Sequence, residues 1–359
     1  MTTVHPLQTQ NQSTSAIPVD LIRTVAILGV LLLHAANDLT IQVINDLEIW
    51  RWCIVDVYQS VGRMGVPLFV MLTGALLLAP SKNEDLGVFF KKRFARIGLP
   101  FIFWAVAYFL WDIYVEGQQV TQGFIVQGIL TGPYFQFWYL YMLMGLYLLT
   151  PLLRLMVPHM TDKLFKYFMV IWFVGVSLVP LLELATPYDF NPNLFAIPGY
   201  VGYFLLGAYL VNVRVKRSTL VALLCVGIAL TAIGTFQMSR TVGGGTSFYF
   251  QEYLSPTMIL SSISLFLLLN TFRTPCDQPV EQSWRKRIMR AISENTLGIY
   301  LFHMMVIYAF QNGFFGFSLN GNTVNSIVGV PLMVGLVLVV CLAVLVPLKR
   351  VPVLKRLIG

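Results

Sequence analysis

The sequence predicts an all-α integral membrane protein that crosses the bilayer about ten times. Of its 359 residues, 57% are hydrophobic and only 11% are charged, whereas soluble domains carry about 25% charged residues. Apolar runs long enough to span a bilayer as helices, roughly 17–25 residues, alternate with polar breaks or breaks that contain glycine and proline. Ten runs are expected to span it, at about residues 17–37, 58–79, 97–115, 135–156, 164–184, 195–212, 219–238, 254–270, 291–311 and 325–347.

Positive charge orients these runs. Twenty of the 24 lysines and arginines fall in the loops after the second, fourth, sixth and eighth runs, with their flanks, and in the C-terminal tail. Because cytoplasmic loops are rich in lysine and arginine, both termini are predicted to be cytoplasmic. We expect residues 1–16 to form a disordered tail, residues 17–348 the transmembrane domain and residues 349–359 a short basic tail. Since topology accounts for the net charge of +8, the bilayer, and no nucleic acid, is the expected partner.

The first run carries Asp20, Arg23 and His34 at membrane depth, where ionisable residues are costly and commonly functional. Arg23 and His34 are eleven positions apart, which returns to within about 20° of the same helix face. They are also separated by roughly 16 Å along the axis. One interpretation is that both residues are functional, with His34 in an internal cavity. The other is that the arginine snorkels to a lipid headgroup and that the histidine forms a hydrogen bond with another helix.

The second run places Arg63 in its outer part, and Pro67 predicts a kink close by. Arg63 either pairs with a loop acid such as Asp56 or lines the same cavity as His34. Thr73, followed by Gly74, belongs either to that cavity or to a packing face of small residues.

The cytoplasmic loop after the second run contains Arg93 and Arg96, three positions apart and therefore on one face of a helix. Arginine forks suit the recognition of phosphate. A cytosolic site for a polyphosphorylated ligand is one interpretation, and an ordinary basic membrane anchor is the other.

Aromatic and histidine residues in two later runs are weaker candidates for the cavity. Trp138 opens the fourth run and suits either an interfacial aromatic belt or stacking against a sugar. His303 falls near the middle of the ninth run, with Tyr300 close by on a neighbouring face. His303 is either a hydrogen-bonding group between helices or a cavity residue.

Several common chemistries have no signature in the sequence. The four cysteines are scattered without a CxxC pair or an adjacent histidine, so neither a bound metal nor a disulfide framework is expected. There is no phosphate-binding Walker loop, no GxSxG elbow and no HExxH motif. Acidic residues inside the runs are few, which disfavours an ion-coupled transporter.

The chain resembles the membrane acyltransferase-3 family, whose polytopic members acylate hydroxyls of surface glycans and glycolipids. The resemblance spans nearly the whole chain, and its motifs keep the family's order and spacing. They are Arg23 and His34 with ten residues between them, VPLFVMLTG (Val66–Gly74), Arg93 and Arg96 as RxxR, FWYLYMLMGLYLLTPLL (Phe137–Leu153), GYFLLGAYL (Gly202–Leu210) and NTLGIYLFH (Asn295–His303). Two departures are Thr73, where the family usually has serine, and the lack of an SGNH-type hydrolase domain after the last run.

The resemblance implies an O-acyltransferase of the cytoplasmic (inner) membrane, with cytosolic acyl-CoA, most often acetyl-CoA, as donor. It implies that Arg93 and Arg96 bind the CoA phosphates and that His34 acts on an acceptor hydroxyl of a lipid-linked or surface glycan. His34 would serve as general base or carry the acyl group covalently. Arg23 would hold the CoA or stabilise an oxyanion.

Two other functions remain as alternatives. A transporter or flippase of a glycolipid or small metabolite would use a similar polar cavity, but it has no need to bind acetyl-CoA. A membrane sensor or assembly partner without catalysis would tolerate replacement of Arg23 and His34.

Overall fold

The computed structural model of the chain describes residues 15–45, 49–79, 84–186, 191, 198–241, 248–275, 283–319 and 325–359. Within these ranges the chain is mostly helical, and turns and coil segments connect the helices. The described strands form one antiparallel pairing of two-residue strands, β1 (Ser15–Ala16) and β2 (Thr274–Pro275). The predicted all-α membrane fold is confirmed. Most of the tail predicted at residues 1–16 lies outside the described residues.

Each of the ten predicted runs coincides with an apolar helical stretch. Eight stretches of the described chain are long and apolar enough to cross a membrane, and the two shorter apolar helices are α10 and α14. The helices are α1 (Val19–Asn45), α2 (Ile49–Gly62), α3 (Gly65–Leu77), α4 (Leu86–Arg93), α5 (Leu99–Tyr114), α6 (Gln122–Thr131), α7 (Trp138–Met156), α8 (Asp162–Phe173), α9 (Val179–Ala185), α10 (Gly199–Leu210), α11 (Arg217–Thr241), α12 (Pro256–Asn270), α13 (Trp284–Glu294), α14 (Thr296–Gln311), α15 (Ser326–Leu348) and α16 (Pro352–Leu357). Short irregular helices link some of them, at η2 (Phe94–Gly98), η3 (Phe135–Phe137), η4 (Val157–His159), η5 (Val174–Leu178) and η6 (Tyr249–Gln251).

Three stretches begin earlier than hydropathy predicts. The second starts at Ile49 rather than near residue 58, because Arg51 and Asp56 lower the hydropathy of a segment that is nevertheless helical. The third and fourth start at Leu86 and Gln122, since α4 and α6 precede the apolar runs.

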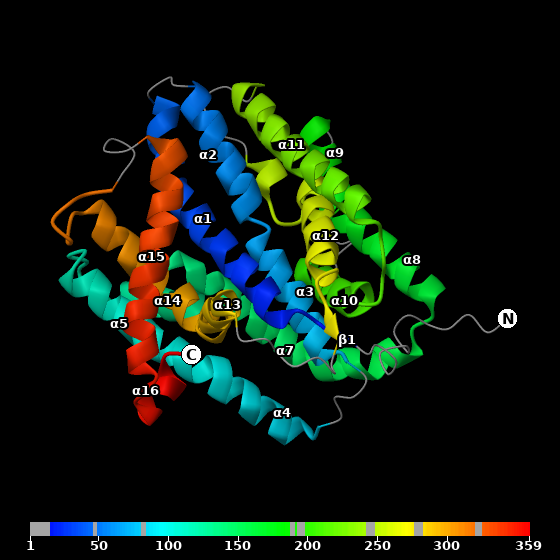
Figure 1. The fold of residues 1–359 in the computed structure, drawn as a ribbon, viewed down its shortest axis with the longest axis horizontal. Helices are drawn as coiled ribbons and strands as arrows, with labels where there is room; N and C mark the ends of the chain where they lie inside the picture. The colour runs from blue at the N-terminus through cyan, green and yellow to red at the C-terminus, as the bar shows by residue number, and fades with distance from the viewer. Residues whose placement is uncertain are drawn as a thin grey trace.

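Helix α1 lies inside the bundle, where it contacts α2, α3, α13, α14 and α15 (Figure 1). Its approach to the second stretch is close: a Cβ atom at Gly62 would lie 2.7 Å from the carbonyl oxygen of Gly29 on α1. The helix is interrupted here at Arg63 and Met64, as predicted, because Pro67 has no amide hydrogen to donate to the Arg63 carbonyl. This contact fixes α1, with Arg23 and His34, against α2 and α3.

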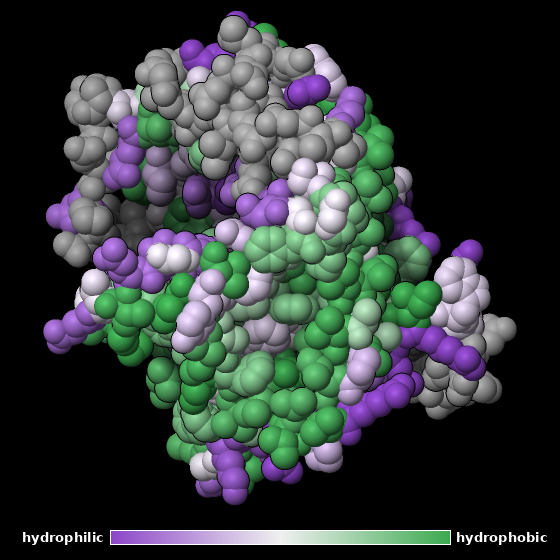
Figure 2. Space-filling view, turned by 90° about the vertical axis from the view of Figure 1, so that its left-hand side faces the viewer, coloured by the Kyte–Doolittle hydropathy of each residue, from purple (hydrophilic) through white to green (hydrophobic). Residues whose placement is uncertain are grey.

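The outside of the bundle fits a lipid environment. Large apolar side chains such as Leu110 on α5, Leu148 on α7, Val170 on α8 and Val339 on α15 are exposed. Figure 2 shows a broad hydrophobic surface bordered by hydrophilic residues. Because lipid tails take the place of water around a membrane-spanning segment, exposed apolar side chains are expected there.

Candidate active site

A cavity of about 590 Å³ opens between α1, α3, α7, α14, the α4–η2 segment and the end of the chain. Its lining carries five basic residues, Arg23, Arg93, Arg96, Lys349 and Lys355. Glu294 is the one acid among the lining residues, and its carboxylate lies 3.4 Å from the Nε of Arg290. The cavity therefore has a strong excess of positive charge, which favours an anionic ligand.

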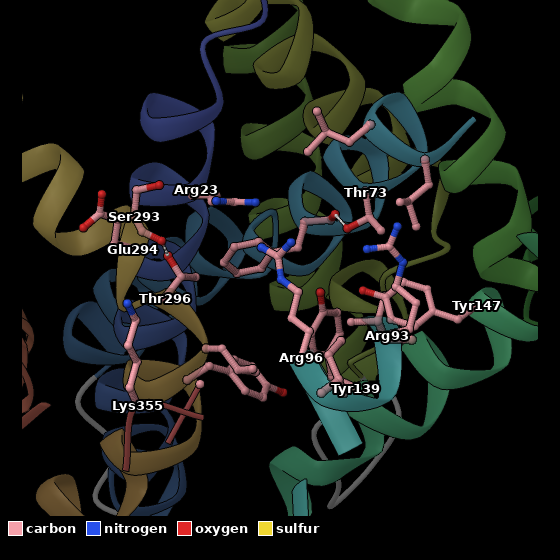
Figure 3. A pocket seen from close by; sticks show the side chains of 18 of the residues that line it. Arg23, Thr73, Arg93, Arg96, Tyr139, Tyr147, Ser293, Glu294, Thr296 and Lys355 are labelled. Atoms are coloured by element: carbon pink, nitrogen blue, oxygen red, sulfur yellow. Dashed lines mark hydrogen bonds between the residues drawn. The ribbon is translucent and has the colours of Figure 1, made fainter. Parts of the chain in front are cut away.

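Arg23 and Arg96 point toward one another across this cavity, Arg23 from α1 and Arg96 from the π-helical turn η2 (Figure 3). In the described parts of the chain, neither guanidinium forms an ion pair with a carboxylate. Two guanidinium groups that face each other without an acid between them repel, and a bound anion relieves that repulsion.

The end of α1 that carries Arg23 is anchored on α13. The hydroxyl of Ser293 donates a hydrogen bond of 2.7 Å to the Asp20 carboxylate, and the hydroxyl of Thr24 donates one of 3.2 Å to the carbonyl of Met289. Asp20 is therefore held by Ser293 close to Arg23, and the two contacts fix the position from which Arg23 enters the cavity.

Arg93 is held by the protein in a way that Arg96 is not. Its Nη2 lies 3.4 Å from the Glu84 carboxylate, and its guanidinium is 4.9 Å from the ring centre of Phe89 and 5.9 Å from that of Tyr147. The hydrogen bond from Lys92, together with the charges of nearby arginines, lowers the pKa of Glu84 below its ordinary value. Arg93 is thus both a lining residue and part of an ion-pair cluster, whereas Arg96 presents its charge to the cavity.

Thr73 and Gly74 have different roles. Thr73 lines the cavity, and its hydroxyl donates a hydrogen bond of 2.7 Å to the carbonyl of Phe69 one turn earlier. A Cβ atom at Gly74 would lie 1.8 Å from the carbonyl oxygen of Phe204, so α3 and α10 touch backbone to backbone there. Thr73 therefore belongs to a cavity, and Gly74 belongs to a packing face of small residues.

A column of rings leads from the cavity to His34. Tyr139 and Tyr300 both line the cavity, with their ring centres 5.1 Å apart. The ring of Tyr300 lies 5.9 Å from that of His303, and the His303 ring lies 5.1 Å from that of His34. His34 is partly buried and also contacts Phe135, at 5.2 Å. His34 and His303 are thus neighbours, and the ring of Tyr300 connects them to the cavity.

His303 is fully buried, and the protein fixes one of its two ring nitrogens. Its Nδ1 lies 3.2 Å from the carbonyl oxygen of Ile299. Since a carbonyl only accepts, Nδ1 carries a proton, and in the neutral ring Nε2 has the free lone pair. Nε2 has no hydrogen-bond partner among the described residues. His303 can therefore accept a hydrogen bond at Nε2.

Arg63 and Trp138 do not line the cavity. The Arg63 guanidinium lies over the ring of Tyr253, at 5.6 Å, and the same ring is 5.4 Å from that of Trp138. The buried carboxylate of Asp56 accepts a hydrogen bond from Gln251 rather than from Arg63. The structure thus brings Arg23, Thr73, Arg93, Arg96 and Tyr300 together and leaves His34, His303, Arg63 and Trp138 outside the cavity lining.

Sequence reasoning missed the contribution of the chain end. Lys349 and Lys355 were assigned to cytoplasmic topology, because a basic tail after a last span is typical of that role. No local pattern distinguishes a lysine that lines a cavity from one that only sets orientation. Tyr147, which also lines the cavity, gave no signal in a run already rich in aromatic residues.

Comparison with known protein families gives one match. A family model described as an acyltransferase domain, that of the acyltransferase-3 family, matches residues 18–346, nearly the whole chain. The searches of curated proteins and of solved structures gave no match.

Proposed function

This chain belongs to the acyltransferase-3 family, and on that premise we propose that it transfers an acyl group from cytosolic acyl-CoA to a glycan hydroxyl. Acetyl-CoA is the proposed donor, and a surface or lipid-linked glycan is the proposed acceptor. The family and the apolar helices together identify the chain as a multi-pass membrane acyltransferase. Residence in the cytoplasmic membrane is part of the proposal, because the donor is cytosolic.

The observation that carries the proposal is the pair Arg23 and Arg96, which face each other across the cavity and form no ion pair with a carboxylate in the described chain. An acyl-CoA brings a diphosphate and a monophosphate, and guanidinium groups bind phosphate through paired, charge-assisted hydrogen bonds. The cavity is of the size usual for small-molecule sites, roughly 300–1,000 Å³.

His34 is the proposed general base. The acceptor hydroxyl gives its proton to His34 as its oxygen attacks the thioester carbonyl, the carbon–sulfur bond then breaks, and His34 returns the proton to the departing CoA thiolate. Atoms and charge balance without another reactant. The ring column Tyr139–Tyr300–His303 supports this role, since it connects the cavity with His34.

Arg23 is assigned to the donor rather than to the reacting carbonyl. It lines the cationic cavity with Arg96, whereas His34 lies roughly 16 Å farther along the same helix. Two side chains so far apart cannot both contact one thioester carbonyl. We therefore assign the phosphates to Arg23 and the acceptor hydroxyl to His34, with the pantetheine arm of the donor between them.

The acceptor proposal has support from a second cavity. This cavity has a volume of about 740 Å³, and amide and hydroxyl side chains, including Gln118, Gln127 and Thr131, line it. None of its lining residues is charged, and neutral donors and acceptors of this kind suit sugar hydroxyls. Pro133 is part of the lining, two positions before Phe135, whose ring contacts His34.

The experiment uses purified protein in proteoliposomes with radiolabelled acetyl-CoA and a glycan acceptor. We expect labelled acceptor from the wild-type protein and a loss of turnover of about 10²–10⁴-fold in His34→Ala, the usual contribution of a general base. His159→Ala is the control, because His159 is exposed at the end of η4. Wild-type turnover in His34→Ala would remove the base assignment. Label that stays on the protein after His34→Ala would also rule out an acyl-His34 intermediate.

A transporter or flippase is the second candidate function. It predicts movement of a glycolipid without consumption of acetyl-CoA. Release of free CoA in the same proteoliposomes separates the two, since transport alone does not break a thioester.

A further inference from the structure

The last eleven residues of the chain form a wall of the cationic cavity. Gly359, Lys349 and Lys355 all line it. After Lys349 the chain turns into α16, and the following Ile358 is only 1% exposed. The indole nitrogen of Trp104 on α5 donates a hydrogen bond of 3.4 Å to the carbonyl of Ile358. The segment predicted as a short basic tail is therefore packed against the bundle, where it holds two lysines in place.

The contact with α14 is equally close. A Cβ atom at Gly298 would lie 3.1 Å from the carbonyl oxygen of Ile358, so the last turn of the chain rests on the backbone of α14. The same helix carries Tyr300 and His303. The position of the two lysines is thus tied to the helices that build the rest of the site.

The two lysines line the same cavity as Glu294. The Nζ of Lys349 donates a hydrogen bond of 2.8 Å to the carbonyl oxygen of Glu294. Burial lowers the pKa of Lys349, and the charge of Lys355 lowers it further, while the charge of Glu294 opposes both. Lys355 is exposed on α16. Two ammonium groups at one wall of a cavity favour a compact anion between or above them.

This lysine pair is separate from the arginines. In Figure 3 Lys355 lies on one side of the cavity and Arg93 on the other, with Arg96 between them and directed toward Arg23. The cavity thus offers two positions for anions, one beside arginines and one beside lysines. Guanidinium forks suit the paired oxygens of a diphosphate, and an ammonium group suits a single phosphate as a point charge.

We propose that Lys355 and Lys349 bind the 3′-phosphate of the ribose of acyl-CoA, while Arg23 and Arg96 bind its 5′-diphosphate. This inference rests on the proposed function, because it names the part of the donor that each wall of the cavity recognises. It makes the end of the chain a specificity element, which distinguishes CoA from 3′-dephospho-CoA and from other nucleoside diphosphate derivatives.

The test compares two ligands on the purified full chain in lipid nanodiscs at one low ionic strength, since salt screens exposed charges. Calorimetry measures the dissociation constants of CoA and 3′-dephospho-CoA. We expect the wild-type protein to bind CoA about tenfold more tightly, the effect of one charge-assisted hydrogen bond. Lys355→Ala should weaken CoA binding about tenfold and leave 3′-dephospho-CoA binding unchanged.

Two further variants make the result specific. Arg356→Ala removes the same charge from the neighbouring position of α16, and its side chain is outside the cavity lining, so the preference for CoA should persist. Arg96→Ala should weaken the binding of both ligands by similar factors. Lys355 is exposed, so its replacement should not affect folding, which the melting temperature of each variant checks.

The outcomes separate this inference from the proposed function. If the wild-type protein binds neither ligand, the proposed donor is wrong. If it binds both with equal affinity, the donor stands and the assignment of the lysines is overturned. An equal loss for both ligands in Lys355→Ala would also overturn it, because the lysine would then act only through the general positive field of the cavity.

Discussion

Replacement of Arg96 by alanine should weaken CoA binding about tenfold and leave the fold intact. Arg96 faces Arg23 across the cavity and has no ion pair in the described chain, so its charge is available to a phosphate. A hydrogen bond to a charged group contributes about 1.5–3 kcal/mol, which corresponds to roughly a tenfold to 150-fold change in affinity. Because the Arg96 side chain is exposed, solvent screening places the effect at the lower end of that range.

The thermal stability of the ligand-free protein should not decrease in Arg96→Ala. Removal of Arg96 ends its repulsion with Arg23, so the melting temperature without ligand should stay the same or rise slightly. Arg93→Ala, in contrast, removes the ion pair with Glu84 and the contacts with Phe89 and Tyr147. It should therefore lower the melting temperature as well as the affinity.

Titration calorimetry with CoA, together with a thermal melt of each variant with and without CoA, measures both effects. Lys91→Ala is the matched control, because it removes one positive charge from the same segment at an exposed position outside the cavity lining. Equal losses of affinity in Arg96→Ala and Lys91→Ala would contradict a specific contact between Arg96 and CoA, since only the general surface charge would then matter.

Three further predictions concern packing, pH and the histidine pair. Gly74→Ala should destabilise the protein by about 1–3 kcal/mol, because the new Cβ would lie 1.8 Å from the Phe204 carbonyl oxygen. Gly145→Ala is the control, because Gly145 has open space around it. Equal melting temperatures of the two variants would contradict the close contact between α3 and α10. The pKa of Glu84 is lowered in the folded state, so its ion pairs stabilise the protein above the unfolded pKa of about 4.3 and are lost as pH falls through the folded pKa. In Glu84→Gln the melting temperature should therefore fall less steeply as the pH is lowered. An unchanged pH dependence would count against a stabilising role of the Glu84 ion pairs. His303→Phe keeps a ring beside His34 but removes the unpaired Nε2, so turnover should fall about tenfold, the contribution of one hydrogen bond, with CoA affinity unchanged. Wild-type turnover would make His303 a packing residue only.

The sequence was sufficient for the positions of the membrane helices because their signal is local. A run of about 20 apolar residues has few alternatives to a spanning helix, and all ten predicted runs are helical. The starts of the second, third and fourth stretches were misplaced, because the helices α2, α4 and α6 begin before the predicted apolar runs.

The division of labour within the site was beyond local reasoning. Arg93 and Arg96 looked equivalent in sequence, and they differ because Glu84 forms an ion pair with Arg93, whose guanidinium also lies over the ring of Phe89. In the same way, Arg63 contacts Tyr253 of a distant segment, while Asp56 is engaged by Gln251. Such pairings depend on which helices become neighbours, which a single sequence does not specify.

Arg23 and His34 on α1 show how far the sequence pattern predicts the site and where it stops. Spacing alone placed Arg23 and His34 on nearly one face. The structure adds that Arg23 enters the cationic cavity and that His34 instead contacts His303 and Phe135. Two residues of one helix face therefore lie in different environments, because they are separated by roughly 16 Å along α1.

Transfer from a cytosolic donor to a glycan at the cell surface is tested most directly when the membrane separates the donor from the acceptor. Proteoliposomes are filled with radiolabelled acetyl-CoA, and the glycan acceptor is supplied only outside. We expect labelled acceptor outside and free CoA inside, both abolished by His34→Ala and both preserved in His159→Ala. Labelled acceptor that forms only when donor and acceptor share one side of the membrane would contradict this expectation.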